Sequence, residues 1–481
     1  MTGNWLRRGV GAVIAAVVLV AAALLWIAVA SADPMTVPAT VQHAFLGPFS
    51  VVYSRTRPPG RVMLGALALA LLAMAGVALV TWRFSRTARA SLDAASHPLS
   101  PHLVMNSTRG RYAGDVTITV LVPAHNEAER LTATLDCLLG QDRRPDRVIV
   151  VTDNCTDETA EVARATGVSV FDTVDNPDKK AGALNQVLAL LLPDAGDNDV
   201  VMVLDADTLL AQGFLAAAAR RFTTDRALMA LGGVFTGEPG HGWLGMFQRN
   251  EYTRYARTIS RRRGRVDVLT GTSTLFRPRA LRTVASSRGH NLPGRAGDVY
   301  DTTSLTEDNE ITIALKSLGA LIVSPPECMV VTELMDSWGD LWRQRLRWQR
   351  GAVENIGAYG LTPATFRYWA QQLGIGYGTI ALGAYLTCMT ILFLAAGTWI
   401  WFPFWLGIGT VFMIERMVTA WPVGWAGRLL AALLLPELFY DLYLDVVYVT
   451  GLIEITIDRT ASWGHEALEP ETAALERQTA S

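Results

Sequence analysis

Long apolar runs on both sides of a polar central region constrain this chain more than any other feature. Half of its 481 residues are apolar, so part of the chain is expected to lie in lipid. Five runs are about long enough to cross a bilayer, at residues 9–30, 62–82, 374–400, 401–421 and 429–453. The chain is therefore expected to hold a water-facing domain between membrane segments.

These runs predict five regions. They are an N-terminal membrane region (1–110), a polar domain (111–335), amphipathic helices at the membrane surface (336–371), C-terminal membrane helices (372–455) and a short tail (456–481). Arg7 and Arg8 precede the first run, and Arg83, Arg86 and Arg89 follow the second. Basic flanks face the cytoplasm, so we expect a multi-pass protein of the cell (plasma or inner) membrane with a cytoplasmic polar domain. Three arginines between positions 55 and 61 oppose this orientation.

Two interpretations of the first run stay open. Its arginines, its apolar core and the small residues at 30–32 resemble a signal peptide, whereas its length favours a retained helix.

The polar domain alternates strand-like and helix-like patterns. Short runs rich in Val and Ile predict strands, and amphipathic patterns between them predict helices (strands 116–122, 147–152, 168–171 and 200–204; helices 127–139, 157–166 and 180–192). This order predicts an α/β fold with a mostly parallel sheet covered by helices. Ligands bind such sheets at the carboxyl ends of the strands.

Charge and cysteine usage exclude some functions. The net charge is only −2, which argues against a general nucleic-acid binder. The four cysteines form no CxxC pair, so we interpret them as buried side chains in a reducing compartment.

Asp205 and Asp207 follow an apolar strand, where unpaired carboxylates would be costly to bury. Mg²⁺ or Mn²⁺ binds one or two carboxylates together with phosphate oxygens, so this pair predicts a metal–diphosphate site.

Two further strand-end residues are candidates. Asp153 could accept hydrogen bonds from a nucleobase, or cap a helix. Lys180 could neutralise a phosphate, or lie solvated on the surface.

Glu307 and Asp308 begin a helical pattern. They could cap the helix, or one could be a general base, and chemistry alone does not separate the two.

The stretch 338–359 combines an apolar helical face with several arginines. It could lie on the membrane surface, with one arginine binding phosphate and Trp348 packing on a sugar ring.

The motifs DxD, TED and QxxRW occur in this order within residues 116–351. Together they resemble family 2 glycosyltransferases with a GT-A fold, of the membrane-integrated, processive kind that includes cellulose, hyaluronan and chitin-oligomer synthases. The stretch 344–351 and the compact layout look closest to poly-N-acetylglucosamine synthases.

The resemblance implies roles for individual residues. Asp308 matches the catalytic base. Residues matching the nucleotide-sugar site are Asp153, Lys180, Asp205, Gln344 and Arg347; those matching the acceptor site are Trp348, Gly271, Thr272 and Ser273; the metal pair is Asp207 with Asp205. Thr152 stands where the family often has a first aspartate, which is a departure from the family pattern at the uracil contact.

The implied function is an inverting, processive transfer from a UDP-sugar, with UDP-N-acetylglucosamine favoured, to a growing β-linked polysaccharide. The implied cofactor is Mg²⁺ or Mn²⁺, and the partners are the lipid bilayer and either a small accessory membrane protein or a second copy. Export of the polymer could be coupled. The alternatives are a cellulose- or hyaluronan-type synthase, a non-processive polyprenyl-phosphate sugar transferase, and a non-catalytic membrane scaffold. The QxxRW motif argues against the transferase, and the intact acids argue against the scaffold.

Two features outside these motifs carry open alternatives. The loop 286–304 is either a mobile flap over the site or an inert surface loop. Glu437, Asp441 and Asp445 share one helix face, so they line a channel or face a partner, unless that helix lies at the membrane surface.

Overall fold

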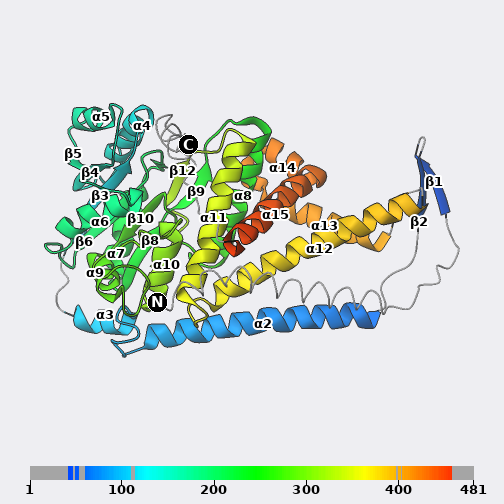
Figure 1. Ribbon diagram of the computed structural model, residues 1–481, viewed down its shortest axis with the longest axis horizontal. Coiled ribbons are helices and arrows are strands. Elements are labelled where there is room, and N and C mark those ends of the chain that lie inside the picture. The colour runs from blue at the N-terminus through cyan, green and yellow to red at the C-terminus, as the bar shows by residue number, and fades with distance from the viewer. Residues whose placement is uncertain are drawn as a thin grey trace, which may run out of the picture.

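The computed structural model describes residues 42–46, 49–53, 60–109, 114–396, 399–401 and 403–457 (Figure 1). An α/β domain lies at one end of the molecule, and two long helices, α2 (Gly60–Ala90) and α12 (Phe366–Ala396), extend from it in the same direction. The predicted span 9–30 and the tail 458–481 lie outside the described residues.

A seven-stranded sheet forms the centre of the α/β domain, in the order β11-β8-β10-β6-β3-β4-β5. Its strands are β3 (Thr117–Ala124), β4 (Arg147–Thr152), β5 (Ser169–Asp172), β6 (Asp199–Leu204), β8 (Leu228–Gly232), β10 (Ser273–Phe276) and β11 (Leu321–Val323). All pairings are parallel except those that β10 makes with β6 and β8. The predicted α/β class with a mostly parallel sheet is therefore confirmed.

Helices cover both faces of this sheet because its strands alternate. On β6, Val201 and Val203 pack on one face, whereas Val200, Met202 and Leu204 pack on the other. The first face carries α6 (Lys179–Leu191), α9 (Pro278–Ser287) and α10 (Glu307–Ser317), and the second carries α4 (Ala128–Leu139) and α7 (Phe214–Thr224). Together with α5 (Thr159–Ala165), the early helices and strands lie within two residues of the predicted bounds.

A small second sheet, β7-β12-β9, leads from the α/β domain to the C-terminal helices. It consists of β7 (Leu209–Leu210), β9 (Val234–Gly237) and β12 (Met329–Thr332). Helix α8 (Gly242–Arg261) follows β9, and helix α11 (Trp338–Tyr359) follows β12. The sheet thereby fixes the starting points of α8 and α11, which carry the next layer of the molecule.

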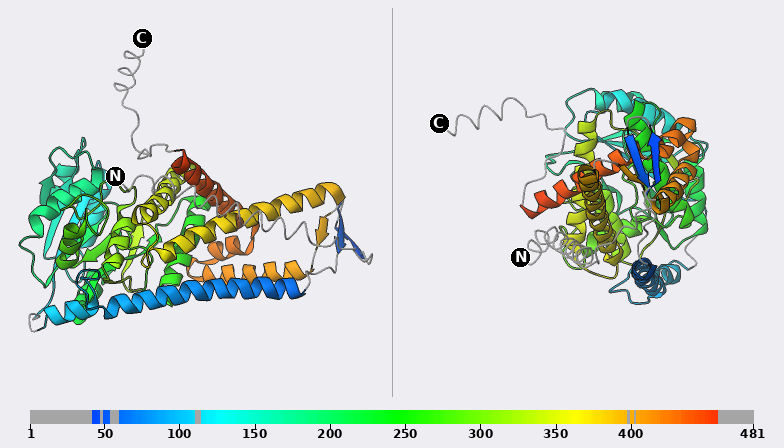
Figure 2. Two further views of the ribbon diagram at one scale, coloured as in Figure 1. Left: turned by 60° about the horizontal axis from the view of Figure 1, so that its bottom comes forward. Right: turned by 90° about the vertical axis from the view of Figure 1, so that its right-hand side faces the viewer.

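The C-terminal helices pack on α8 and α11 (Figure 2). They are α13 (Pro403–Thr419), the short η1 (Trp421–Val423), α14 (Trp425–Ala432) and α15 (Leu435–Thr456). Remaining elements are the helix α3 (Pro101–Ser107) and the strands β1 (Gln42–Leu46), β2 (Phe49–Tyr53) and β13 (Trp399–Trp401), which form a third sheet far from the α/β domain.

Two helices in the described part of the chain are long and apolar enough to cross a membrane, at Ala68–Ala90 in α2 and Phe366–Ile391 in α12. The run 401–421 falls mostly on α13. The run 429–453 is divided between α14 and α15, because the helix is interrupted at Leu433 and Leu434 and restarts with Pro436 in its first turn. The predicted spans otherwise remain predictions.

The acidic face of α15 is paired within the chain. Glu437 is buried, and its Oε2 accepts ion pairs from Arg254 of α8 (2.8 Å) and Arg416 of α13 (2.7 Å). Arg416 also reaches Asp441 (2.6 Å), and the Thr379 hydroxyl of α12 donates to Asp445 (2.9 Å). These three acids therefore connect α15 to neighbouring helices. That they line a channel stays a prediction.

Candidate active site

The edge of the main sheet where β3, β4 and β6 end gathers the predicted motifs. Asp153 follows β4 and Asp205 follows β6. Because β10 runs antiparallel to β6, with Ser273 opposite Leu204, the segment before β10 reaches the same edge. The Asp205 N–H donates to the Thr272 carbonyl (2.9 Å), which places the predicted acceptor segment beside the first DxD carboxylate.

Lys180 lies between two carboxylates from different motifs. Its Nζ is 2.6 Å from Asp205 Oδ1 and 3.0 Å from Glu307 Oε1. Burial opposes the charge on Lys180, but both partners outweigh burial, so its pKa lies well above the usual value. Burial likewise opposes ionisation of Glu307, yet the ion pair lowers its pKa. Glu307 is therefore held as a carboxylate.

Asp308 has different surroundings from its neighbour. Its Oδ2 accepts a hydrogen bond from the Gly271 N–H (3.1 Å) and its Oδ1 one from the Asn309 N–H (2.7 Å). Burial, with the adjacent Glu307 charge, raises the pKa of Asp308 to about 6. The carboxyl also lines a cavity of about 20 Å³ shared with Lys180 and Tyr300, about the space of one water.

Helix capping explains neither the contact of Glu307 nor the one that Asp308 makes with Gly271, although Asp308 also accepts from the Asn309 N–H in the first turn (2.7 Å). Thr306 is the residue before α10, and its side chain makes no capping hydrogen bond. Glu307 instead binds Lys180, and Asp308 binds the backbone before β10. Both side chains are thus directed toward the sheet edge.

Asp207 lies where negative charge accumulates. Its Oδ1 accepts from the Thr208 hydroxyl (3.1 Å). Burial of Glu127 and the charges of Asp207 and Glu333 raise the pKa of Glu127 to about 7, although Arg130 opposes the shift. Glu127, which lies between β3 and α4, is not among the site residues predicted from the sequence.

A divalent cation fits this donor set. In the described ranges, no three His, Cys, Asp or Glu side chains gather closely enough to hold a metal by themselves. Mg²⁺ and Mn²⁺ sites at phosphates use one or two carboxylates and complete their shell with phosphate oxygens and water. Asp205 and Asp207 match that pattern, and the charge around Glu127 favours a cation.

Asp153 is buried in a network of hydrogen bonds. Its Oδ1 accepts from the side chains of Thr173 (2.8 Å), Asn176 (2.7 Å) and Asn154 (3.3 Å). It does not cap the following helix; Asp157 instead accepts from the Thr159 N–H (3.1 Å). The network fixes the position of the carboxyl group beyond β4.

The QxxRW motif lies on α11 beside these acids. Gln344 has a buried Oε1 with no hydrogen-bond partner among the described residues. The charge of Arg347 favours the ionised forms of Glu307 and Asp308, so the guanidinium lies near both. Buried Thr272 and Ser273 hydroxyls also lack partners in the described part of the chain. The Ser273 hydroxyl faces Gly233, where an added Cβ would lie 2.1 Å from its Oγ, so these oxygens do not all face one site.

Arg345 holds Trp348 rather than an anionic ligand. Its guanidinium donates to both oxygens of Glu251 on α8 (3.0 Å each) and stacks over the Trp348 ring, 4.5 Å from the centroid. Tyr440 of α15 donates to the same Glu251 (2.7 Å). Two other arginines of α11 are also paired, Arg343 with Asp340 and Arg350 with Glu354 and Glu454. Sequence reasoning could not identify these partners.

Helix α11 is closely packed against the start of α10. The Asn355 amide donates to the Thr306 hydroxyl (3.2 Å) and carbonyl (3.3 Å). A Cβ at Gly351 would lie 2.4 Å from Thr306 Oγ1, a distance that real side chains do not reach. Only glycine therefore allows α11 to approach the residue that precedes Glu307.

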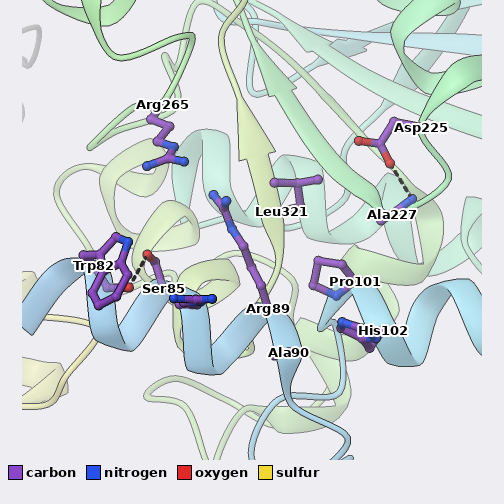
Figure 3. Close-up of a pocket in the computed structure, with 11 residues that line it drawn as sticks. Trp82, Ser85, Arg89, Ala90, Pro101, His102, Asp225, Ala227, Arg265 and Leu321 are labelled. Atoms are coloured by element: carbon purple, nitrogen blue, oxygen red, sulfur yellow. Dashed lines mark hydrogen bonds between the residues drawn. The ribbon is translucent and has the colours of Figure 1, made fainter.

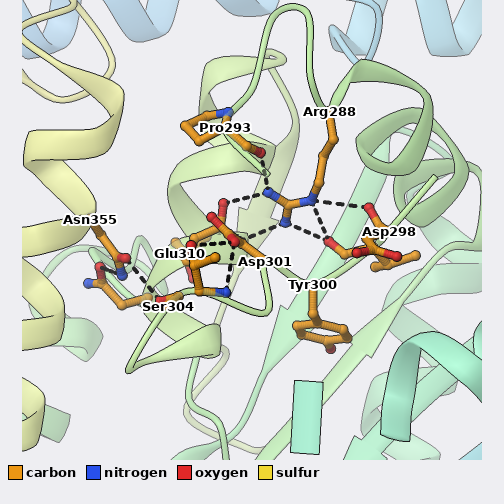
Figure 4. Close-up of polar contacts among 12 residues, drawn as sticks. Arg288, Pro293, Asp298, Tyr300, Asp301, Ser304, Glu310 and Asn355 are labelled. Atoms are coloured by element: carbon orange, nitrogen blue, oxygen red, sulfur yellow. Dashed lines mark hydrogen bonds and ion pairs between the residues drawn. The ribbon is translucent and has the colours of Figure 1, made fainter. Parts of the chain in front are cut away.

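The loop 286–304 is tightly held on both sides (Figure 4). Arg288 is fully buried and donates to both oxygens of Glu310 on α10 (2.8 and 2.7 Å) and to the Val299 carbonyl (2.6 Å). Asn185 of α6 binds the backbone of Val299 and Tyr300. The structure therefore describes an anchored loop whose Tyr300 faces the small cavity beside Asp308.

Comparison with known proteins agrees with this arrangement. Residues 115–351 match the family described as Glycosyltransferase like family 2. This segment, just under half of the chain, is similar to family 2 glycosyltransferase domains. It contains the sheet, the DxD pair, Asp308 and the QxxRW helix up to Gly351.

Curated relatives match over the same part of the chain. The poly-beta-1,6-N-acetyl-D-glucosamine synthase of Staphylococcus aureus strain COL is 29% identical over 247 residues, 49% of this chain and 55% of the relative. The synthase of the same name from Staphylococcus epidermidis is 26% identical over 274 residues, 53% of this chain and 59% of the relative. The chain thus spans somewhat more than half the length of these relatives.

Among solved structures, similarity is found to the mannosyltransferase PcManGT from Pyrobaculum calidifontis in complex with GDP-Man and Mn²⁺. It has 18% identity, a TM-score of 0.49 and coverage of 82% of this chain and 99% of that one. The glucosyl-3-phosphoglycerate synthase of Mycobacterium tuberculosis matches with a TM-score of 0.34, at 18% identity, over 55% of this chain and 83% of that one.

Proposed function

We propose that this protein is a membrane-bound, inverting glycosyltransferase that polymerises a UDP-sugar, with UDP-N-acetylglucosamine favoured, into a β-linked polysaccharide. The observation that carries the proposal is the pair of acids at the start of α10. Glu307 is bound by Lys180, whereas Asp308 faces the acceptor segment with a pKa near 6. A general base needs that combination of access and a pKa close to neutral.

In the proposed reaction, Asp308 takes the proton from an acceptor hydroxyl. The hydroxyl oxygen forms a bond to the anomeric carbon of the donor, and the bond from that carbon to the diphosphate oxygen breaks. UDP leaves with the electron pair and its negative charge. Attack opposite to the leaving group converts an α-linked donor into a β-linked product, and alignment of the two sugars supplies much of the rate.

Two cations of the chain would compensate the charge on departing UDP. Lys180 already lies between Asp205 and Glu307, and Arg347 lies near Glu307 and Asp308. Asp205 and Asp207 would hold Mg²⁺ or Mn²⁺, whose chemistry is to neutralise developing charge on a diphosphate. Asp153 would receive the uracil ring, since its carboxyl group is fixed beyond β4.

An acceptor would bind between β10 and α11. Gly271, Thr272 and Ser273 precede or begin β10, and Trp348 offers a ring whose orientation is set by Arg345. The unpaired oxygens of Gln344 and Thr272 would be available for hydrogen bonds to a sugar. A polymer product is supported by the QxxRW helix and by the relatives, whose names describe a β-1,6-linked N-acetylglucosamine polymer.

The test is UDP release by the full chain in nanodiscs, over a panel of UDP-sugars with Mg²⁺ or Mn²⁺ and with Asp308→Asn alongside. We expect Asp308-dependent turnover of UDP-N-acetylglucosamine into a long product that linkage-specific hydrolases degrade. A single transfer to a lipid acceptor would contradict polymerisation. Turnover that persists in Asp308→Asn would contradict the assigned base.

A further inference from the structure

A basic groove lies between the end of α2 and the α/β domain, away from the proposed active site (Figure 3). It consists of two adjoining cavities of about 570 and 340 Å³. Both are lined by Trp82, Ser85, Arg89 and Arg265. None of the described residues that line the groove lines the small cavity beside Asp308.

Two arginines in the groove lack a counterion. Arg89 of α2 and Arg265, just beyond α8, point toward the same space and are close enough to repel each other. Neither guanidinium group makes a hydrogen bond or ion pair within the described ranges. Asp225 lines the same cavity, but its carboxylate accepts from the Ala227 N–H (3.0 Å) on the far side of Leu321 in this view.

The second cavity adds further positive charge. Its lining contains five cationic side chains, Arg89, Arg262, Arg265, Lys316 and Arg367, and one acidic side chain, Asp267. Asp267 is already paired with Arg262 (2.6 Å) and Arg367 (3.0 Å). Burial and these two arginines lower the pKa of Lys316 to about 8 in spite of Asp267. The described part of the groove therefore has too few acidic side chains to balance its cationic ones.

The chain holds Arg265 in place without an anion. The Gly264 N–H donates to the Ile259 carbonyl (3.1 Å) at the end of α8, and the Ser324 N–H donates to the Gly264 carbonyl (2.8 Å). Gly264 has a positive φ of 76°, which suits this tight turn. The backbone of this turn is already ordered, so only the exposed Arg265 side chain loses freedom when a ligand binds.

The groove also has an apolar side that points to its ligand. Helix α2 exposes a series of large apolar side chains before Arg83, among them Leu71, Leu72, Met74 and Leu79. Trp82, about half exposed, lies where this apolar surface meets Arg86 and Arg89. Tryptophan followed by arginines is typical of the boundary between acyl chains and lipid headgroups.

We propose that this groove binds the phosphate group of an anionic phospholipid, with Arg89 and Arg265 as its main ligands and the acyl chains along α2. Guanidinium groups bind phosphate oxygens through paired, charge-assisted hydrogen bonds. Basic pockets beside a membrane helix on the cytoplasmic side are suited to such headgroups. The inference concerns a second site, and it stands independently of the proposed transferase activity.

The test uses the purified full chain in detergent and titrates it with phosphatidylglycerol, phosphatidylcholine or inorganic phosphate, with binding measured by native mass spectrometry. We expect tighter binding of phosphatidylglycerol than of phosphatidylcholine. The double variant R89Q/R265Q should weaken phosphatidylglycerol binding by about fivefold per arginine. R89K/R265K keeps charge and packing but loses the paired geometry, so it should give an intermediate result and stay folded.

The matched control is R144Q/R220Q, which removes two exposed arginines of the α/β domain outside the groove. We expect it to bind phosphatidylglycerol like the wild type. Equal binding of the two lipids, or equal weakening by both glutamine variants, would overturn the proposal. Arginine-dependent binding of inorganic phosphate with no preference for phosphatidylglycerol would also overturn it, because the groove would then recognise a soluble phosphate.

Discussion

Gly351→Ala tests whether the contact between α11 and α10 positions Glu307 and the proposed base, Asp308. The new Cβ would lie 2.4 Å from Thr306 Oγ1, 2.7 Å from its Cγ2 and 3.0 Å from its Cβ. Ordinary contacts begin near 3.4 Å, so Thr306 or α11 must move by about an ångström. Thr306 directly precedes Glu307 and Asp308, and a misplacement of this size can cost about 10²-fold in rate.

The expected effect on stability is much smaller than the effect on rate. Overpacking costs about 1–3 kcal/mol. Replacing glycine by alanine within a helix returns about 1 kcal/mol. The net loss of unfolding free energy is therefore about 0–2 kcal/mol, and the variant should remain folded. We expect a fall of about 10²-fold in kcat for UDP release.

The assay compares initial rates of UDP release and thermal unfolding for Gly351→Ala and Gly374→Ala. Gly374 lies exposed in α12 with open space where a Cβ would stand, so its variant should match the wild type in rate. The double variant G351A/T306A removes the two closest atoms and should recover part of the lost rate. A wild-type rate in G351A, or a double variant that is merely additive, would refute the positioning argument.

Three further predictions follow from the ion pairs and the raised pKa values. The proposed base, Asp308, can take a proton only when it is ionised, and its pKa is near 6. The rate should therefore fall about tenfold per pH unit below pH 6 and level off above it, while Glu307 stays ionised. A rate independent of pH between about 5 and 7 would contradict this. Lys180→Met should lower UDP release at least tenfold and destabilise the fold by up to about 3 kcal/mol. The reason is that Asp205 and Glu307 lose their shared cation. Unchanged thermal unfolding would contradict this, because water would then replace the cation. Arg288→Met should cost about 3–5 kcal/mol in chemical denaturation, since Glu310 stays buried, bound by the Tyr359 hydroxyl but without a cation. R288M/E310L should recover part of that loss.

The sheet and the strand-end motifs were predictable because they depend on local patterns. Short runs of Val and Ile fixed β3, β4 and β6 within two residues, and parallel strands bring their carboxyl ends to one edge. Asp153 and Asp205 could therefore be assigned to that edge from the sequence alone. The interruption between α14 and α15 had a local signal too, since Pro436 favours the first turn of a helix.

Long-range partners were not predictable in the same way. Glu307 and Asp308 have the same chemistry and adjacent positions, so only the direction of the first turn of α10 separates them. Arg345 pairs with Glu251 on α8, and Arg288 pairs with Glu310 on α10. The hydrophobic pattern of the sequence does not predict which helices pack together, so it could not predict these pairs. The loop 286–304 could be interpreted from its sequence as a mobile flap, because the sequence does not reveal that Arg288 is buried among backbone carbonyls.

The pairing of Glu437 has a consequence for biosynthesis. This carboxylate is buried against Arg254 from α8 and Arg416 from α13, and a buried charge left without a partner is strongly unfavourable. Helix α15 can therefore pack in its native position only after α8 has formed and α13 lies beside it. The ribosome produces α8 first, so the folded α/β domain would serve as the template on which the last helices of the nascent chain assemble.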